Sequence, residues 1–123
     1  MAPVLSDVGT QPLHEVARQR SEMVTAVRGN RWVPAHEAAA ITLSNLGHTG
    51  IDRFRAIIKP DETMILALGS VQERVVADQG QIVVQTGFTM VLSADHRVVD
   101  GVEAARFLTK IAAIISDGSW KIV

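Results

Sequence analysis

The chain contains no cysteine, and its charges do not favour one sign. The absence of cysteine excludes disulfides, thiolate metal sites and a cysteine nucleophile, so any thiol chemistry must use the sulfur of a substrate. The 12 basic and 13 acidic residues give a formal net charge of -1, and they do not form runs. A protein that binds nucleic acid or an anionic membrane usually carries a basic surface. We therefore expect neither nucleic acid nor a membrane as a partner.

Targeting signals and long apolar runs are also missing. The first seven residues, MAPVLSD, have neither the basic region nor the apolar run of a secretory signal. No stretch approaches the roughly 20 apolar residues that span a membrane. The expected location is the cytoplasm, or the mitochondrial matrix if the source is a eukaryote.

Apolar residues make up 47% of the 123 residues, which is enough to bury the core of one domain. Apolar spacing predicts a helix capped by Thr10 and ended by Gly29, and another from Gly101 to about residue 116. Between them we expect strands at 39–44, 63–68, 71–77 and 82–84, a hairpin turn at 78–81, and a β-rich segment at 86–93. The order αββββα predicts an α+β sandwich, with helices packed on a mixed, largely antiparallel sheet, and a single domain over residues 1–123.

Four histidines are candidates for a functional role. His14 and His36 lie among charged residues in helical or turn context, which is typical of solvated surface positions. His48 lies in a glycine-containing loop, where it could contact a ligand or belong to a surface turn. His96 follows the last strand-like segment and precedes the last helix, so its side chain is expected at the edge of a sheet.

His96 lies between Asp95 and Asp100. An imidazole oriented in that setting could act as a base near its usual pKa of about 6.5, although a structural role stays open. Asp100 also fits a capping box with Glu103 three residues later, which would explain an acidic residue there without any catalytic role. The HxxxD spacing does not predict a metal site, because no third ligand follows at suitable spacing.

Two motifs occur in the same order as in a known family. Residues 95–101, DHRVVDG, and residues 44–47, SNLG, resemble the DHRxxDG signature and the SNLG segment of the dihydrolipoamide acyltransferases, the E2 components of 2-oxoacid dehydrogenase complexes. The similarity extends to residues 50–51, 57–60, 65–69 and 92–93. A related HxxxDG occurs in chloramphenicol acetyltransferase and in peptide-synthetase condensation domains, but the flanking residues fit E2 better. The resemblance implies part of a chloramphenicol acetyltransferase-like sandwich, namely the C-terminal part of an E2 catalytic domain.

The resemblance also implies a reaction and the residues that perform it. His96 would be the general base that takes a proton from the thiol of coenzyme A, and the thiolate would attack an acyl thioester on a dihydrolipoyl group. Ser44 would donate a hydrogen bond to the oxyanion of the tetrahedral intermediate. Asp100 would hold the structure beside the histidine through an arginine. Coenzyme A is then a substrate, the lipoyl group comes from another domain, and no metal takes part.

The same resemblance implies an assembly. In the family the site lies between subunits of a trimer, so His96 of one chain is expected to face Ser44 of a neighbour in a homotrimer. The apolar ending 118–123 would dock into further trimers of a larger core, or else pack on its own domain. Residues matching the first half of the catalytic domain are missing, and so are a lipoyl domain and a peripheral-subunit-binding domain. A lipoyl domain acting in trans and a separate N-terminal half-domain are therefore expected partners.

Two interpretations remain. The chain is an acyltransferase catalytic unit, or it is a non-catalytic, core-forming structural subunit or remnant of such a complex. The presence of both His96 and Ser44 favours the first, and the missing half favours the second. Lys59 and Asp61 also differ from the asparagine and the second proline that are common around the family's proline.

Overall fold

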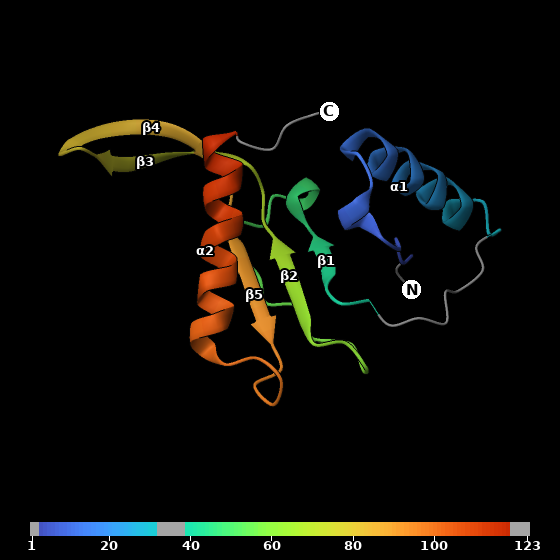
Figure 1. Ribbon diagram of the computed structural model, residues 1–123. Helices are drawn as coiled ribbons and strands as arrows, with labels where there is room; N and C mark the ends of the chain where they lie inside the picture. The colour runs from blue at the N-terminus through green and yellow to red at the C-terminus, as the bar shows by residue number, and fades with distance from the viewer. Residues whose placement is uncertain (1–2, 32–38, 119–123) are drawn as a thin grey trace. The chain divides into compact units, whose positions relative to one another are not determined.

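The computed structural model describes residues 3–31 and 39–118 (Figure 1). Its elements are η1 (Val8–Thr10), α1 (Leu13–Arg28), β1 (Thr42–Asn45), η2 (Gly47–Thr49), β2 (Met64–Leu68), β3 (Gln72–Asp78), β4 (Gln81–Gly87), β5 (Met90–Ala94) and α2 (Gly101–Asp117). The chain divides into two compact units, residues 1–39 with 109–123, and residues 40–108. Within the described ranges, none of the helices has the length and apolar character needed to cross a membrane.

In the first unit, α1 begins later than its sequence pattern predicts. The hydroxyl of Thr10 donates to the carbonyl of Asp7 at 2.9 Å, inside η1, so it does not cap the helix. The N-cap position is Pro12 instead, without a side-chain cap. The predicted end is confirmed, because the amide of Gly29 donates to the carbonyl of Thr25 at 2.9 Å.

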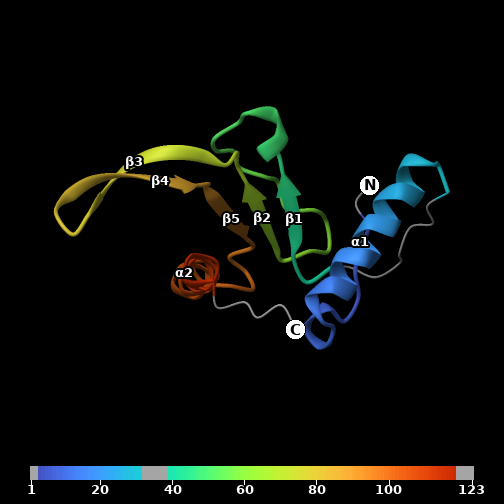
Figure 2. The ribbon, with the colours of Figure 1, turned by 90° about the horizontal axis from the view of Figure 1, so that it is seen from above.

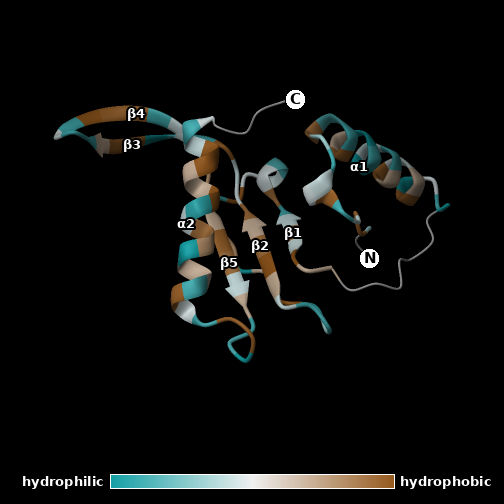
Figure 3. Cartoon of the chain, viewed as in Figure 1, coloured by the Kyte–Doolittle hydropathy of each residue, from teal (hydrophilic) through white to brown (hydrophobic). Residues whose placement is uncertain are grey.

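The three-stranded sheet of the second unit is mixed, as predicted. Its strand order is β1-β2-β5, with β1 parallel to β2 and β5 antiparallel to it. The central strand contains the buried apolar residues Ile65, Leu66 and Ala67, which are 4%, 4% and 1% exposed. A continuous apolar run suits a strand covered on both faces, and β2 appears brown along its length in Figure 3.

The predicted hairpin is also confirmed. Strands β3 and β4 pair antiparallel, with Val75 opposite Val84. The turn residues Gln79 and Gly80 both have positive φ, 47° and 80°, as a two-residue type I′ turn requires. Figure 2 shows the hairpin extending away from the three-stranded sheet.

Two strand predictions are wrong in their limits. The segment 86–93 contains the end of β4 and most of β5, so the described residues form five strands instead of the expected four. Strand β4 pairs with β3, whereas β5 pairs with β2. In the short connection between β4 and β5, the carbonyl of Thr89 accepts the amide of Gly69 at 3.0 Å. Strand β1 begins at Thr42 because its pairing with β2 starts at Ile65.

Candidate functional site

The turn between β5 and α2 holds His96 on a fixed backbone. The amide of Asp95 donates to the carbonyl of Thr63 at 2.9 Å, and the carbonyl of Asp95 accepts the amides of Val98 and Val99 at 2.9 and 3.0 Å. His96 lies inside this turn and is exposed. The imidazole is therefore exposed to solvent on a turn whose backbone is held by hydrogen bonds.

Asp95 is engaged by Arg97 and not by the histidine. Nη2 of Arg97 lies 2.6 Å from Oδ2 of Asp95, and its Nε and backbone amide both donate to Oδ1 at 3.0 Å. These bonds, the side-chain one foremost, lower the pKa of Asp95 to about 2. Within the described residues His96 has no hydrogen-bond partner, so neither flanking aspartate orients its ring.

Asp100 caps α2, as the sequence predicts. Its Oδ1 accepts the amides of Val102 at 2.8 Å and Glu103 at 2.9 Å, which satisfies two of the free donors at the start of the helix. No arginine pairs with Asp100 in the part of the chain that the structure describes. Its observed role is therefore to join the His96 turn to the helix.

An open depression of about 500 Å³ lies beside the histidine. Two turns line it, and their residues are Ile58, Lys59, Pro60, Asp61 and Glu62 on one side and Ala94, Asp95, His96 and Arg97 on the other. Because the depression is open and its histidine is unpaired among the described residues, a thiol can approach the imidazole from solvent.

A polar cluster that sequence reasoning missed holds one wall of this depression. Nζ of Lys59 donates to Oε1 of Glu62 at 3.0 Å and to Oγ1 of Thr42 at 3.1 Å. The hydroxyl of Thr42 donates to Oε2 of Glu62 at 2.5 Å. Burial opposes ionisation of Glu62, but the hydrogen bonds from Thr42 and Lys59 outweigh it, so its pKa is lowered. The i,i+3 spacing of Lys59 and Glu62 is the sequence signal for part of this cluster.

Ser44 lies at the other end of the sheet from His96. It is half-buried on β1 and stands opposite Ala67, which stands opposite Val91 on β5. Ala94, the last residue of β5, is three residues beyond Val91, and His96 follows it.

These positions separate the two candidate residues within one chain. Two strand spacings and three residues along β5 place the Cα atoms of Ser44 and Ala94 about 14 Å apart, and the chain then continues past the end of the strand. The depression that contains His96 does not include Ser44. A base and an oxyanion donor that serve one reacting group must both lie about 3 Å from it, so the described chain does not bring this pair together.

The other candidates do not join this site. His14 on α1 and His48 in η2 are exposed, while His36 and residues 119–123 lie outside the described residues. Over ranges 3–31 and 39–118, no three histidine or acidic side chains are arranged to hold a metal ion.

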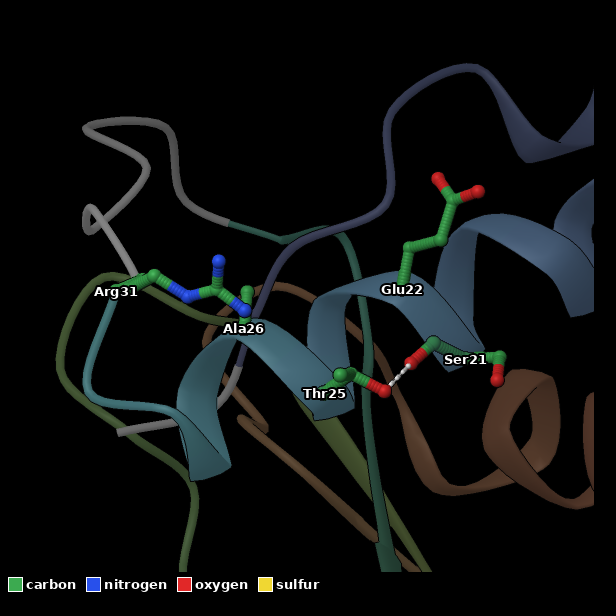
Figure 4. Close-up of a pocket in the computed structure, with 5 residues that line it drawn as sticks. All are labelled: Ser21, Glu22, Thr25, Ala26 and Arg31. Atoms are coloured by element: carbon green, nitrogen blue, oxygen red, sulfur yellow. Dashed lines mark hydrogen bonds between the residues drawn. The ribbon is translucent and has the colours of Figure 1, made fainter.

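A separate depression of about 400 Å³ lies along α1 (Figure 4). Its lining residues are Ser21, Glu22, Thr25, Ala26 and Arg31. The hydroxyl of Thr25 donates to the carbonyl of Ser21 at 2.9 Å, so it serves the helix backbone. None of the candidate catalytic residues lines this depression.

Comparison with known proteins places these motifs in context. Residues 1–120 match the family model of the 2-oxoacid dehydrogenases acyltransferase (catalytic domain). Over 124 aligned residues the chain is 30% identical to the dihydrolipoyllysine-residue acetyltransferase component of the pyruvate dehydrogenase complex of Rickettsia felis, covering 100% of this chain and 30% of that protein. It is 36% identical over 119 residues to the chloroplastic dihydrolipoyllysine-residue acetyltransferase component 5 of the pyruvate dehydrogenase complex of Arabidopsis thaliana. This match covers 95% of this chain and 26% of that protein. The chain thus spans less than a third of the length of these relatives.

Solved structures show the same similarity. The chain superimposes on dihydrolipoamide acetyltransferase of Azotobacter vinelandii with a TM-score of 0.87 and 30% identity, covering 94% of this chain and 48% of that one. It superimposes on the cubic core of a pyruvate dehydrogenase multienzyme complex with a TM-score of 0.88 and 29% identity, again covering 94% and 48%. These similarities support the α+β, chloramphenicol acetyltransferase-like fold.

The spacing of the candidate residues matches the Azotobacter vinelandii protein. There, roles in the catalytic mechanism were investigated for a serine, a histidine 52 positions later and an asparagine four positions after that. The same intervals, 52 and four, separate Ser44, His96 and Asp100. Asparagine and aspartate are both strong N-cap residues, so the third position can have the same capping role with either side chain.

Proposed function

Because the chain belongs to the family of 2-oxoacid dehydrogenase acyltransferase catalytic domains, which it matches over residues 1–120, we propose that it transfers an acyl group between a dihydrolipoyl thiol and coenzyme A. The observation that carries this proposal is the shared spacing of Ser44, His96 and Asp100 with the serine, histidine and asparagine of the Azotobacter vinelandii enzyme. The exposed imidazole on an open depression supports it, since a substrate thiol can reach it.

In this mechanism His96 accepts the proton of the coenzyme A thiol, and the thiolate attacks the carbonyl carbon of the acyl thioester. The dihydrolipoyl sulfur then leaves and receives a proton, and the reverse reaction uses the same groups. General-base catalysis of this kind contributes roughly 10² to 10⁴ in rate. The reaction needs no protein thiol, which agrees with the absence of cysteine.

Ser44 donates a hydrogen bond to the oxyanion that forms during the attack, a contribution of roughly 10² to 10³ in rate for a well-placed donor. Since Ser44 and His96 of one chain lie at opposite ends of the sheet, the donor comes from a second copy. The assembly is a homotrimer, or a larger core built from trimers. The similarity to the cubic core of a pyruvate dehydrogenase complex supports a core assembly.

Asp100 is a positioning residue in this mechanism. It contacts no reacting group, and it acts by capping α2 with the amides of Val102 and Glu103. A capped helix start fixes the end of the turn that contains His96.

In this proposal the chain forms the C-terminal part of a catalytic domain, and its similarity to 48% of the Azotobacter vinelandii chain supports a match to one part of such a domain. Its partners are then a lipoyl domain that delivers the acyl group in trans and the N-terminal half of the domain. The location is the cytoplasm, or the mitochondrial matrix in a eukaryote.

The test is acyl transfer from acylated dihydrolipoamide to coenzyme A, measured with the chain alone and with its partner chains. His96→Ala should lower kcat by roughly 10² to 10⁴. His48→Ala, which removes another exposed histidine from the same unit, should retain the wild-type rate. A His96→Ala protein with the full rate would exclude the proposed base. A large assembly in sedimentation without any wild-type turnover would favour the structural subunit.

A further inference from the structure

A second depression, separate from the one beside His96, contains two arginines. It has a volume of about 340 Å³ and is lined by Arg53, Phe54, Arg55 and Val91. Both arginines are exposed, whereas Phe54 is half-buried. None of these residues has a role in the proposed mechanism.

The two arginines differ from other cations of the same unit in their pairing. Lys59, Arg74 and Arg97 each form an ion pair with a carboxylate. Arg53 and Arg55 form no ion pair within the described residues. Arg53 and Arg55 are two residues apart in the sequence, so their Cα atoms are at most about 7 Å apart. Such a like-charged pair gains most from an anion that contacts both side chains.

The depression lies on the same face of the sheet as Ser44. The hydroxyl of Ser93 donates to the carbonyl of Ala56 at 3.0 Å, so the segment that contains the arginines runs along that face of β5. Val91 stands opposite Ala67, and Ala67 opposite Ser44. Directly opposite residues point to the same face. Across two strands, Val91 and Ser44 are about 10 Å apart.

The chemistry of the depression fits a phosphorylated ligand. A guanidinium group binds phosphate with two parallel hydrogen bonds, and these charge-assisted bonds are stronger than neutral ones. Among the substrates of the proposed reaction, coenzyme A carries phosphates, and its pantetheine arm separates them from the thiol. A phosphate site should therefore lie on the same face as the reacting group but away from it.

We infer that Arg53 and Arg55 bind the phosphates of coenzyme A. This assignment rests on the proposed function and adds to it the residues that distinguish coenzyme A from a plain thiol. Phe54 lines the same depression and adds an apolar surface to it. The thiol end of the substrate then extends across the sheet toward Ser44 and the histidine of a neighbouring copy.

The experiment measures binding by calorimetry, using the assembled protein with coenzyme A, 3′-dephospho-coenzyme A and pantetheine. The double variant Arg53→Gln/Arg55→Gln should weaken coenzyme A binding roughly 10- to 100-fold, the usual loss for hydrogen bonds to charged groups. Its affinity for pantetheine should be unchanged, because pantetheine has no phosphate. Arg106→Gln is the matched control, since Arg106 is an exposed arginine of the same unit without an ion pair among the described residues.

Two results would overturn the inference. One is equal binding of coenzyme A by the wild type and the double variant, and the other is equal affinity of the wild type for coenzyme A and pantetheine. Acyl transfer to pantetheine tests the proposed function separately, because it needs the base but not a phosphate site. Wild-type transfer to pantetheine with no effect of the arginine substitutions on coenzyme A binding would refute the arginine site alone.

Discussion

The three-stranded sheet and the β3–β4 hairpin use similar residues in opposite environments. Ile65 on β2 is 4% exposed, whereas Ile82 on β4 is 81% exposed. The central strand β2 has a paired strand on each side, while β3 and β4 pair only with each other in the described sheets. An apolar strand pattern therefore predicts a strand without saying whether its side chains are covered. Burial depends on neighbours that come from distant parts of the chain.

The turn that contains His96 and the β3–β4 hairpin differ in the same way. The turn that contains His96 follows β5, which pairs with the buried strand β2, so its backbone starts from the core. The hairpin leaves three large apolar side chains exposed, namely Val75 at 71%, Ile82 at 81% and Val84 at 64%. A hairpin of two strands is only marginally stable by itself.

The largest expected effect is on the buried sheet. Ile65→Ala removes a nearly fully buried side chain from β2 and should lower the free energy of unfolding by about 2–5 kcal/mol, because lost apolar burial adds to the cost of a cavity. Urea denaturation followed by circular dichroism measures it. A loss below about 1 kcal/mol would mean that β2 is not the core of this unit.

The same substitution in the hairpin should have a much smaller effect. Ile82→Ala truncates a side chain that is 81% exposed, so the free energy of unfolding should change by less than about 0.5 kcal/mol. The measurement is the same denaturation curve, recorded at the same protein concentration. A loss similar to that of Ile65→Ala would break the comparison, since it would show that the hairpin face is covered in solution.

Local signals made part of this structure predictable. The hairpin follows from Gly80 in a two-residue turn, where a positive φ is needed. The buried strand follows from an uninterrupted apolar run. The cap of α2 follows from Asp100 directly before the helix, and its carboxylate accepts the amides that the pattern implies. In each case the partners are close in sequence, so spacing alone identifies them.

Competition and long-range pairing explain what the sequence did not predict. Thr10 has a nearer acceptor, the carbonyl of Asp7, and so does not cap α1. Arg97 occupies the carboxylate of Asp95, which leaves His96 unpaired within the described residues. The contact of Glu62 with Thr42 joins residues 20 positions apart, and no local pattern contains it.

The separation of Ser44 from His96 is also a long-range property. It depends on the register of β1 against β2 and of β2 against β5. The sequence resembles the acyltransferase family through two motifs in the same order, and this resemblance implies that Ser44 and His96 serve one reaction. Only the strand register shows that they lie at opposite ends of the sheet within one chain. This separation is the reason for proposing a site formed by two copies of the chain.

Complementation between two inactive variants tests that central claim most directly. Ser44→Ala and His96→Ala chains, each assembled alone with the same partner chains, should have low acyl transfer to coenzyme A. If the chains are unfolded together and reassembled as a mixture, about a quarter of the interfaces should pair an intact serine with an intact histidine. Activity should then rise toward about a quarter of the wild-type value. A mixture that stays as inactive as its two parents, with subunit exchange demonstrated, would contradict a site built from two copies.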